Sequence, residues 1–551
     1  MLKESLIEEI YSSISKNWDL PAFSDYQGSV KTYGEVGKKI SFWHHLFKDC
    51  KIQPGDKIAV AGRNSSNWAE IYLSTITYGA TVIPILAEFS PDNVHHIVNH
   101  SEALFLFATD HVYDNLEPGK MRKLQAAISL NDFEVKFSNC ENLNKKLQKA
   151  TRQKESEVFK GLTRESFQLP SFTNDHLAAI VYTSGTTGFS KGVMLTHNSL
   201  TANVIYAQNN MPLASGDNIL SFLPLAHSYA CAFEFLFPFT IGCHITFLNK
   251  LPSPQVLIKA FAEVRPRLVF LVPLLIEKIY KNKIKPVLDK KGVKFINNIP
   301  GLNLLIRNKI KKSLTDVFGG NFLEVIIGGA ALNKEVAEFL IDIKFPFTVG
   351  YGMTECGPLI SYAPWDKTAP NSVGNVINYL QIRIDSDDQE NVVGEILVKG
   401  ENVMQGYYKN QEATETTIEK DGWLHTGDLG TIDRNGFIYI RGRSKNMILG
   451  PSGQNIYPEE IEAQLNNLPF IQESLVLEND GKLHALIYPD LEKADSENIE
   501  GKQLDEIINQ NKDHLNKNLP GYSKIQTVKL FPEEFEKTPT KKIKRYLYKL
   551  T

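Results

Sequence analysis

A loop rich in glycine and hydroxyl residues is the clearest chemical feature of the sequence. It spans residues 182–193, with the sequence YTSGTTGFSKGV, and its candidate binding residues are Thr183, Ser184, Gly185, Thr186, Thr187 and Lys191. Glycines let backbone N–H groups approach an anion, hydroxyls donate hydrogen bonds, and a lysine adds positive charge. The sequence therefore predicts a phosphate-binding loop, with a strand before it and a helix after it. The Walker A pattern does not fit, because Gly192 follows the lysine instead of preceding it.

Six further segments follow this loop along the chain. They are LPLAHSY at 223–229, GGAAL at 328–332, GYGMTE at 350–355, GWLHTGDLG at 422–430, RGRSKNMIL at 441–449 with GQNIYPEEIE at 453–462, and KTPTKKIKR at 537–545. In this order the segments resemble the motifs of the acyl-adenylate-forming (AMP-binding) superfamily, which includes acyl-CoA synthetases, peptide-synthetase adenylation domains and luciferases. The last two segments are most similar to those of long-chain fatty acid–CoA ligases.

The resemblance implies that ATP binds to residues from most of these segments. Gly329 and Ala330 leave room for the base, and Tyr351 offers a flat face on which adenine can stack. Asp428 resembles the aspartate that accepts hydrogen bonds from both ribose hydroxyls, and Arg443 resembles the arginine at the ribose or α-phosphate. The implied ATP-binding residues are Thr183, Ser184, Gly185, Thr186, Thr187, Lys191, Gly329, Ala330, Tyr351, Gly352, Thr354, Asp428, Ile440, Arg443 and Lys542.

The resemblance also implies a catalytic set and a metal ligand. Glu355 would hold Mg²⁺, a hard cation that binds carboxylate oxygens together with ATP phosphates. Lys542 would stabilise the step in which a carboxylate attacks the α-phosphorus, because two anions must meet there. His227 matches a residue beside the acyl carboxylate, although a lone histidine in an apolar stretch also suits a protein core. The implied catalytic residues are Lys542, His227, Thr187 and Glu355.

The resemblance predicts a ligase that joins a medium- or long-chain fatty acid to CoA through an acyl-adenylate. Two alternatives remain: the acyl group is loaded onto an acyl carrier protein, or the chain is a non-catalytic adenylate-binding regulator. The apolar segments at 230–242 and 268–280 line an acyl tunnel or belong to a plain core. Amino-acid-activating members carry an acid in their pocket. We find none in its usual context, although Glu234 lies nearby.

The pattern of apolar runs predicts an α/β protein. At roughly 100–200 residues per domain, 551 residues suggest two to four folding units. Short apolar runs alternate with helical segments, which is typical of sheets covered on both faces, whereas residues 110–175 are polar and suggest a loosely packed excursion. We expect a domain at 1–442 with two covered α/β sheets and a β-rich subdomain, and a small mobile α+β domain at 443–551. Lys445 occupies the hinge position between them.

Composition excludes several other classes of protein. Lys plus Arg is 60 and Asp plus Glu is 63, so the net charge of −3 does not suggest nucleic-acid binding. Five cysteines without a CxxC pair suggest reduced thiols, and no long apolar stretch suits a membrane span. Residues 281–312 hold ten basic residues against one acid. They form a solvated face, or they dock the phosphates of a CoA-like carrier or a membrane. We expect a cytoplasmic protein, with peripheral contact at the inner membrane surface as the alternative.

Overall fold

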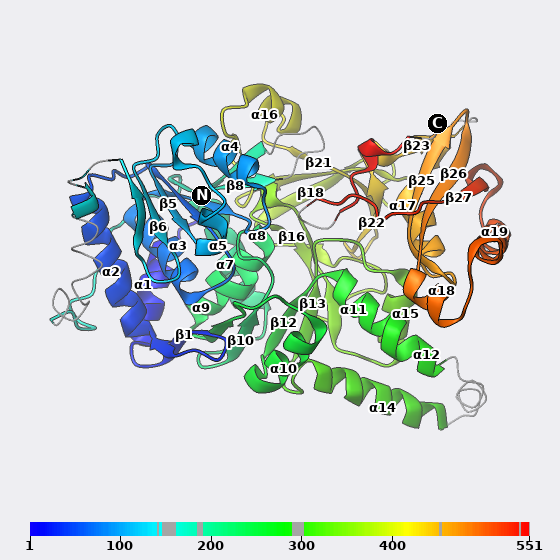
Figure 1. The fold of residues 1–551 in the computed structure, drawn as a ribbon, viewed down its shortest axis with the longest axis horizontal. Helices are drawn as coiled ribbons and strands as arrows, with labels where there is room; N and C mark the ends of the chain where they lie inside the picture. The colour runs from blue at the N-terminus through cyan, green and yellow to red at the C-terminus, as the bar shows by residue number, and fades with distance from the viewer. Residues whose placement is uncertain are drawn as a thin grey trace.

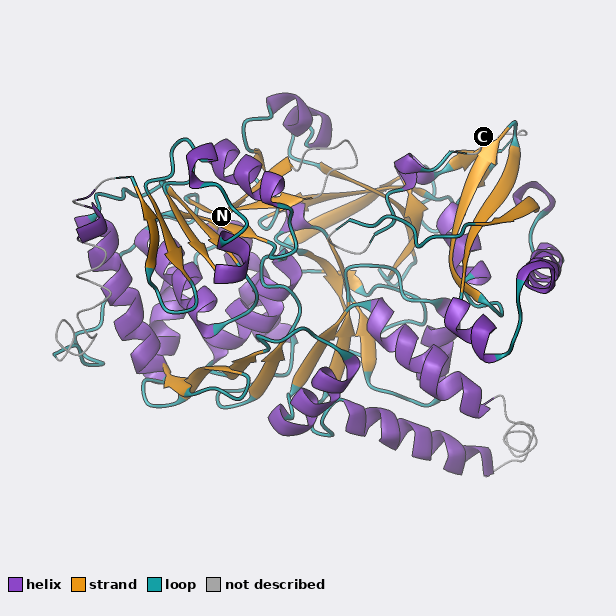
Figure 2. Cartoon of the chain, in the orientation of Figure 1, coloured by secondary structure: helices purple, strands orange, loops and turns teal. Residues whose placement is uncertain are grey.

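The computed structural model describes residues 1–139, 141, 143–145, 161–183, 191–288, 302–450, 454–538 and 542–549. Figure 1 shows the C-terminal residues, in orange and red, as a unit at one end of the molecule. Helices cover the sheets over most of the remaining chain (Figure 2). We call the described residues up to Arg443 the large unit, and residues 454–549, as far as they are described, the C-terminal unit.

The largest sheet among the described residues has eight strands. Their order is β20 (Gly406–Tyr407), β9 (Lys191–Thr196), β8 (Leu177–Thr183), β4 (Thr81–Ile85), β3 (Lys57–Ala61), β5 (Phe105–Ala108), β6 (Ala126–Ser129) and β7 (Val135–Ser138). Alternate residues of β3 face two separate clusters, with Ile58 and Val60 in one and Ala59 and Ala61 in the other. The strand is apolar throughout because both faces of the sheet are covered.

Two predictions about this sheet were wrong. The polar excursion at 110–175 contributes β6 and β7, which extend the sheet at its edge. Each is only four residues long, so neither produced a long aliphatic run. The candidate phosphate loop is followed by β9 and not by a helix, because Thr183 pairs antiparallel with Lys191. The predicted helix comes after that strand, as α7 (His197–Asn210).

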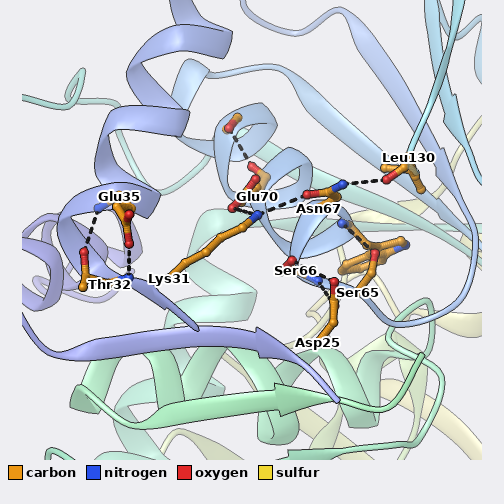
Figure 3. A network of polar contacts seen from close by, with 11 residues as sticks. Asp25, Lys31, Thr32, Glu35, Ser65, Ser66, Asn67, Glu70 and Leu130 are labelled. Carbon is orange, nitrogen blue, oxygen red and sulfur yellow. Dashed lines mark hydrogen bonds and ion pairs between the residues drawn. The ribbon is translucent and has the colours of Figure 1, made fainter. Parts of the chain in front are cut away.

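A second sheet packs beside the first. It consists of β10 (Asn218–Ser221), β11 (His244–Phe247), β1 (Pro21–Asp25) and β2 (Val30–Thr32). Polar contacts join it to α3 (Ser66–Tyr78), as Figure 3 shows: Lys31 forms a 2.6 Å ion pair with buried Glu70 and also donates to Asn67. Asp25 accepts from the backbone N–H of Ser66 at 2.8 Å. These contacts fix helix α3 relative to strands β1 and β2 of the second sheet.

A third sheet, entirely parallel, brings candidate nucleotide residues to one edge. Its strands are β12 (Leu268–Leu271), β13 (Glu324–Ile327) and β14 (Phe347–Val349). The helices that accompany it are α10 (Pro254–Val264), α11 (Pro273–Ile279), α12 (Lys285–Leu288), α14 (Leu302–Val317) and α15 (Lys334–Asp342). Gly329 and Ala330 follow β13, and Tyr351 follows β14. The carboxyl ends of neighbouring parallel strands are a common place for ligands.

In the view of Figure 1, the β-rich region lies between the eight-stranded sheet and the C-terminal unit. Its main sheet is antiparallel, with strands β18 (Leu380–Asp385), β19 (Gly394–Gly400), β21 (Leu424–Ile432) and β22 (Ile438–Arg443). A smaller sheet contains β15 (Tyr351–Gly352), β16 (Leu359–Tyr362) and β17 (Asn375–Val376). Asp428 on β21 and Arg443 on β22 lie directly opposite each other, because they are paired across the two neighbouring strands.

The C-terminal unit has its own hydrophobic core. It contains β25 (Ile471–Asn479), β26 (Lys482–Pro489), β27 (Ile525–Leu530), α17 (Pro458–Leu465), α18 (Leu491–Ser496) and α19 (Gly501–Asn516). The buried members of its two clusters all lie between Ile456 and Phe535. The structure thus confirms the predicted class, a large α/β part with a smaller α+β part. The division after residue 442 stays a prediction, and β22 ends one residue later.

The N-terminal segment forms helix α1 (Leu6–Lys16). It is amphipathic, as expected, and the side chains of Leu6, Ile10 and Ile14 on its inner face are fully buried. Across the described ranges, no helix combines the length and the apolar character needed to cross a membrane.

Candidate active site

Three predicted residues meet where the parallel sheet approaches the β-rich sheet. The hydroxyl of Tyr351 donates to Asp428 Oδ2 at 2.8 Å, and Arg443 Nε lies 2.8 Å from Asp428 Oδ1. Tyr351 and Asp428 are buried, while about half of the Arg443 side chain is exposed. Each carboxylate oxygen has two acceptor positions, so both Asp428 oxygens keep capacity for a further donor such as a ribose hydroxyl.

Glu355 belongs to a second group, which includes an aromatic residue that the sequence did not point to. The hydroxyl of Tyr407 donates to Glu355 Oε1 at 2.8 Å. The ammonium of Lys191 lies 4.7 Å from the centre of the Tyr407 ring, a cation–π arrangement. Tyr407 therefore connects the lysine of the candidate phosphate loop to the candidate metal ligand.

The middle of the candidate phosphate loop, with Ser184, Gly185, Thr186 and Thr187, lies outside the described residues. Its two ends are described. The hydroxyl of Thr183, the last residue of β8, reaches the carbonyl of Lys191 at 3.5 Å. The hairpin geometry therefore places both ends of the loop side by side at the edge nearest Glu355 and Tyr407.

The backbone around Glu355 is held by residues that sequence reasoning missed. Asn203 on α7 donates to the carbonyl of Cys356 at 3.1 Å and accepts from the N–H of Leu359 at 2.8 Å. The N–H of Met404 donates to the carbonyl of Glu355 at 2.8 Å. Asn203 is buried, so both ends of its amide are satisfied by this one turn. The position of the Glu355 carboxylate is thus fixed from two sides.

His227 lies in a loop that two buried polar side chains brace. Glu234 Oε2 accepts from the N–H groups of Phe222 and Leu223, both at 3.0 Å. Asn64 donates to the carbonyl of Leu223 at 2.7 Å and accepts from the N–H of a residue two positions further along. Burial raises the pKa of Glu234 well above its usual range. Its contacts give Glu234 a structural role in this loop, and no sequence motif pointed to Asn64.

Most of the phenylalanine-rich segment at 230–242 is part of the hydrophobic core. Phe233, Phe235, Phe237 and Phe239 are almost completely buried. Beside His227 lies a small apolar cavity of about 10 Å³, lined by Tyr72, Pro84, Val181, Leu195, Leu200, Leu225, Ala226, Ser228, Cys231 and Ala232. That volume corresponds to about one water molecule. An acyl chain could enter here only if the lining moved apart.

Lys542 lies in a hairpin in which three other described cations, Lys537, Lys544 and Arg545, form ion pairs. The N–H of Thr538 donates to the carbonyl of Lys542 at 2.8 Å, which closes the turn. The flanking ion pairs are Lys537 with Glu473 and Glu534, Lys544 with Glu536, and Arg545 with Glu462. Within the described ranges, Lys542 has no ion-pair partner. The ion pairs therefore anchor the hairpin to the C-terminal unit and leave the ammonium of Lys542 unpaired among the described residues.

Electrostatics place Lys542 among the predicted site residues of the large unit. Although its side chain keeps contact with solvent, surrounding protein lowers the pKa of Lys542, and the positive charge of Arg443 lowers it further. The carboxylates of Asp428 and Glu355 act in the opposite direction. Burial, and then the Lys542 charge, lower the pKa of His227 to about 4, so this imidazole is neutral at pH 7. Residues from both units thus converge on one site.

The remaining predicted residues lie around this centre. Gly329 has a φ of 86° and, with Ala330, is exposed at the end of β13. A Cβ on Gly352 would lie 2.2 Å from the carbonyl oxygen of Pro358, so only glycine fits there. Thr354 begins the short turn that holds Glu355, and Ile440 is a partly buried residue of β22. Lys445 is exposed in a short 3₁₀ turn (Ser444–Asn446) directly after β22.

A family model described as AMP-binding enzyme matches residues 12–408 of the chain. Because the match covers most of the sequence, the chain belongs to this family of AMP-binding enzymes. The family predicted from the ordered motifs is thereby confirmed.

Several curated relatives are similar to the chain over most of its length. The long-chain-fatty-acid–CoA ligase FadD15 of Mycobacterium bovis is 28% identical, over 77% of this chain and 71% of the relative. The peroxisomal long chain acyl-CoA synthetase 7 of Arabidopsis thaliana is 29% identical, over 94% of this chain and 79% of the relative. A long-chain-fatty-acid–CoA ligase of Escherichia coli O6:H1 is 28% identical, over 85% of this chain and 82% of the relative.

Solved structures share the fold at lower identity. The anthranilate CoA ligase AuaEII in complex with anthranoyl-AMP has a TM-score of 0.78 at 17% identity, covering 99% of this chain and 97% of that one. ATP-bound MatB from Rhodopseudomonas palustris has a TM-score of 0.76 at 21% identity, with 99% and 98% covered. These matches extend through the C-terminal unit, which the family model does not cover.

Proposed function

We propose that the protein is an acid–thiol ligase that activates a medium- or long-chain fatty acid with ATP and transfers the acyl group to CoA. The observation that carries the proposal is the convergence of Lys542 with Asp428, Glu355 and His227, which come from both units of the chain. A cation among carboxylates and a partly buried, neutral histidine suits a reaction whose substrates are anions.

In the first half-reaction, a carboxylate oxygen of the acid attacks the α-phosphorus of ATP. A new P–O bond forms, the bond to pyrophosphate breaks, and the products are acyl-adenylate and pyrophosphate. Asp428 and Tyr351 orient the ribose and base, while Lys542 and Lys191 reduce the repulsion between carboxylate and phosphates. His227 is neutral, so its N–H can donate to the acid without adding another titrating charge.

Mg²⁺ fits the donor set around Glu355. Tyr407 occupies Oε1 of Glu355, and no described hydrogen bond occupies the second oxygen. Within the described residues, no cluster of three or more His, Cys, Asp or Glu side chains could hold a metal alone. Mg²⁺ commonly uses one carboxylate together with substrate phosphates. Glu355 would hold it against ATP, where the ion would neutralise phosphate charge.

In the second half-reaction, the sulfur of CoA attacks the acyl carbonyl and AMP leaves. The thiol must lose its proton, because the thiolate is the nucleophile. While Lys542 is close, it depresses the pKa of His227, and a histidine with a pKa of about 4 is a weak base. We propose that residues 443–551 rotate about the segment at Lys445, which withdraws Lys542 and makes His227 more basic.

The choice of a fatty acid rests on two observations. The curated relatives described above carry long-chain fatty acid ligase names, and the cavity beside His227 has an apolar lining. Burying each methylene of an acyl chain contributes about 0.8 kcal/mol, so an apolar channel that opened there would favour longer acids. One of the solved structures that share the fold belongs to a ligase named for another acid, anthranilate, so the preferred acid has to be measured.

The test is acid-dependent exchange of labelled pyrophosphate into ATP. Saturated fatty acids of increasing length are compared with anthranilate and malonate at equal concentrations. We expect exchange with medium or long acids only, and exchange with none of them would overturn the enzyme proposal. Exchange with the aromatic or dicarboxylic acid alone would replace the fatty acid by that class.

A thiol panel then distinguishes the acceptors. The acyl-adenylate is offered CoA or an acyl carrier protein that bears phosphopantetheine, and the thioester is measured by mass. We expect CoA to discharge the adenylate. Discharge by the carrier alone would support the acyl carrier alternative, and adenylate binding without exchange would support a regulatory protein.

A further inference from the structure

Two lysines of the basic stretch at 281–312 contact the C-terminal unit. Lys281 Nζ donates to the carbonyl of Ile471 at 2.8 Å. Lys285 Nζ donates to the carbonyl of Asn467 at 3.3 Å. These contacts give part of the basic stretch a role beyond a solvated face: it joins the two units of the molecule.

Asn333, the N-cap residue of the neighbouring helix α15, makes a third contact with the same region. Its amide Nδ2 donates to Asn467 Oδ1 at 2.6 Å and to the carbonyl of Ala463 at 3.4 Å. The other end of the amide caps α15 by accepting from the N–H of Glu335 at 2.9 Å. Glu335 in turn forms a 2.8 Å ion pair with Lys285. Lys285 and Asn333 are thus fixed relative to one another through Glu335.

Two of the donors, Lys285 and Asn333, face the C-terminal end of helix α17, while Lys281 donates to the first residue of β25. The last carbonyl groups of a helix have no partner within the helix and carry partial negative charge, so lysines and amide donors suit them. Lys281 and Lys285 remain about one-third exposed. A polar, partly hydrated interface of this kind can separate without exposing apolar surface, as interfaces between mobile units often can.

Helix α17 also carries the anchor of the Lys542 hairpin. Glu462 on this helix pairs with Arg545 and accepts from the N–H of Val476 on β25 at 2.6 Å. Ala463 is the next residue along, and its carbonyl faces Asn333. One end of the helix therefore contacts the large unit, while the residue beside it holds the hairpin that carries Lys542.

We propose that Lys281, Lys285 and Asn333 form a docking latch that positions Lys542 for the adenylation step. They are positioning residues and do not touch the substrates. This proposal rests on the proposed ligase function. It places the latch in the orientation seen here and predicts that the contacts break when the C-terminal unit turns for thioester formation.

The test removes the two ammonium groups while keeping the apolar stems, in the double variant Lys281→Met/Lys285→Met. We expect acid-dependent pyrophosphate exchange to fall about tenfold. Thioester formation from preformed acyl-adenylate should be unchanged or faster, since the competing orientation is weakened. An equal loss in both half-reactions, or no loss in either, would overturn the proposal.

Two matched variants separate positioning from general damage. Lys278→Met removes an exposed lysine of α11 that has no ion-pair partner among the described residues, and it should leave both half-reactions unchanged. Lys281→Arg/Lys285→Arg keeps both charges and donors and should recover most of the exchange activity. If the double Met variant melts several degrees lower and the Arg variant does not recover exchange, the loss is structural and the proposal fails.

A physical measurement works even if the ligase proposal is wrong. Dyes are attached through encoded azide residues at exposed Asn308 on α14 and exposed Lys502 on α19, so the cysteines are untouched. Energy transfer between them should shift and broaden in the double Met variant and stay unchanged with Lys278→Met. Such a shift without any exchange in the unmodified protein would support the latch and reject the ligase. An unchanged distribution would reject the latch.

Discussion

The two parts of the candidate site are built in contrasting ways. In the large unit, Asp428 and Glu355 are held by partners on neighbouring strands and turns, since Tyr351 and Arg443 contact the first and Tyr407 contacts the second. Lys542 extends from a hairpin of the C-terminal unit and forms no ion pair with any described residue.

Under the proposed function, this contrast separates nucleotide binding from catalysis. Groups that recognise a nucleotide benefit from a fixed geometry, because their orientation need not be ordered again in each cycle. A group needed in one half-reaction only is better placed on an element that can leave. The neutralised cations beside Lys542 fit this division, because they fix the hairpin to its own unit.

Removing the ammonium of Lys542 should have the largest effect on the rate of adenylation. We expect Lys542→Ala to reduce pyrophosphate exchange by roughly 100- to 1,000-fold, the usual range when a group that stabilises transition-state charge is lost. Thioester formation from preformed acyl-adenylate should change by less than about threefold. Both rates are measured by quenched flow with radiolabelled substrates.

Lys544→Ala is the matched control for this prediction. Lys544 lies in the same hairpin but pairs with Glu536 at 3.1 Å. It should keep nearly full exchange activity. Two outcomes would contradict a specific role for Lys542 in adenylation. In the first, Lys544→Ala reduces exchange as much as Lys542→Ala does. In the second, Lys542→Ala impairs both half-reactions equally.

A substitution of Asp428, in the large unit, should raise the KM for ATP more than it lowers kcat. Asp428→Asn keeps the side-chain shape but replaces one acceptor oxygen by a donor, which must face Tyr351 or Arg443. We expect the KM for ATP to rise about tenfold, consistent with about 1.5–3 kcal/mol for a hydrogen bond to a charged group. The change in kcat should be smaller. Steady-state exchange at varied ATP concentration measures both.

Asp387→Asn provides the comparison for this variant. Asp387 is exposed in the same β-rich region, and its side chain forms no hydrogen bond with the residues that the structure describes. Its KM for ATP should equal that of the unmodified protein. A loss in kcat at unchanged KM in Asp428→Asn would place Asp428 with the catalytic groups instead.

The sequence predicted the strands and motif residues better than the contacts that hold them. Tyr351, Glu355 and Asp428 stand in recognisable motifs, and the structure brings them to one region. Asn64 and Asn203 have no local signature, because their partners lie 161 and 156 positions away in the chain. Only the folded topology makes such pairs neighbours.

Errors in the predicted fold have local causes. The segment after the candidate phosphate loop pairs with β8 as a strand, and Gly192 fits in it because a Cβ there would lie 2.8 Å from Ile180. The basic stretch looked uniform, yet Lys281 and Lys285 bind carbonyls of another unit. Charge counts give no distances, so they could not separate these lysines from the exposed ones beside them.

The smallest expected effect measures how the two parts of the site sense one another. Burial and the positive charge of Lys542 both disfavour the imidazolium form of His227, which lowers its pKa from 6.5 to about 4. Removing the charge in Lys542→Ala leaves the burial, so the pKa should rise by less than about one pH unit. Because the folded pKa lies below the unfolded one, the contribution of His227 to stability is present above pH 6.5 and is lost as the pH falls toward 4. Histidine labelled with ¹³C at Cε1, assigned with His227→Gln, reports the titration in both proteins. An identical titration would mean that Lys542 does not lie beside His227. The residues of the large unit and Lys542 of the C-terminal unit would then not form one site.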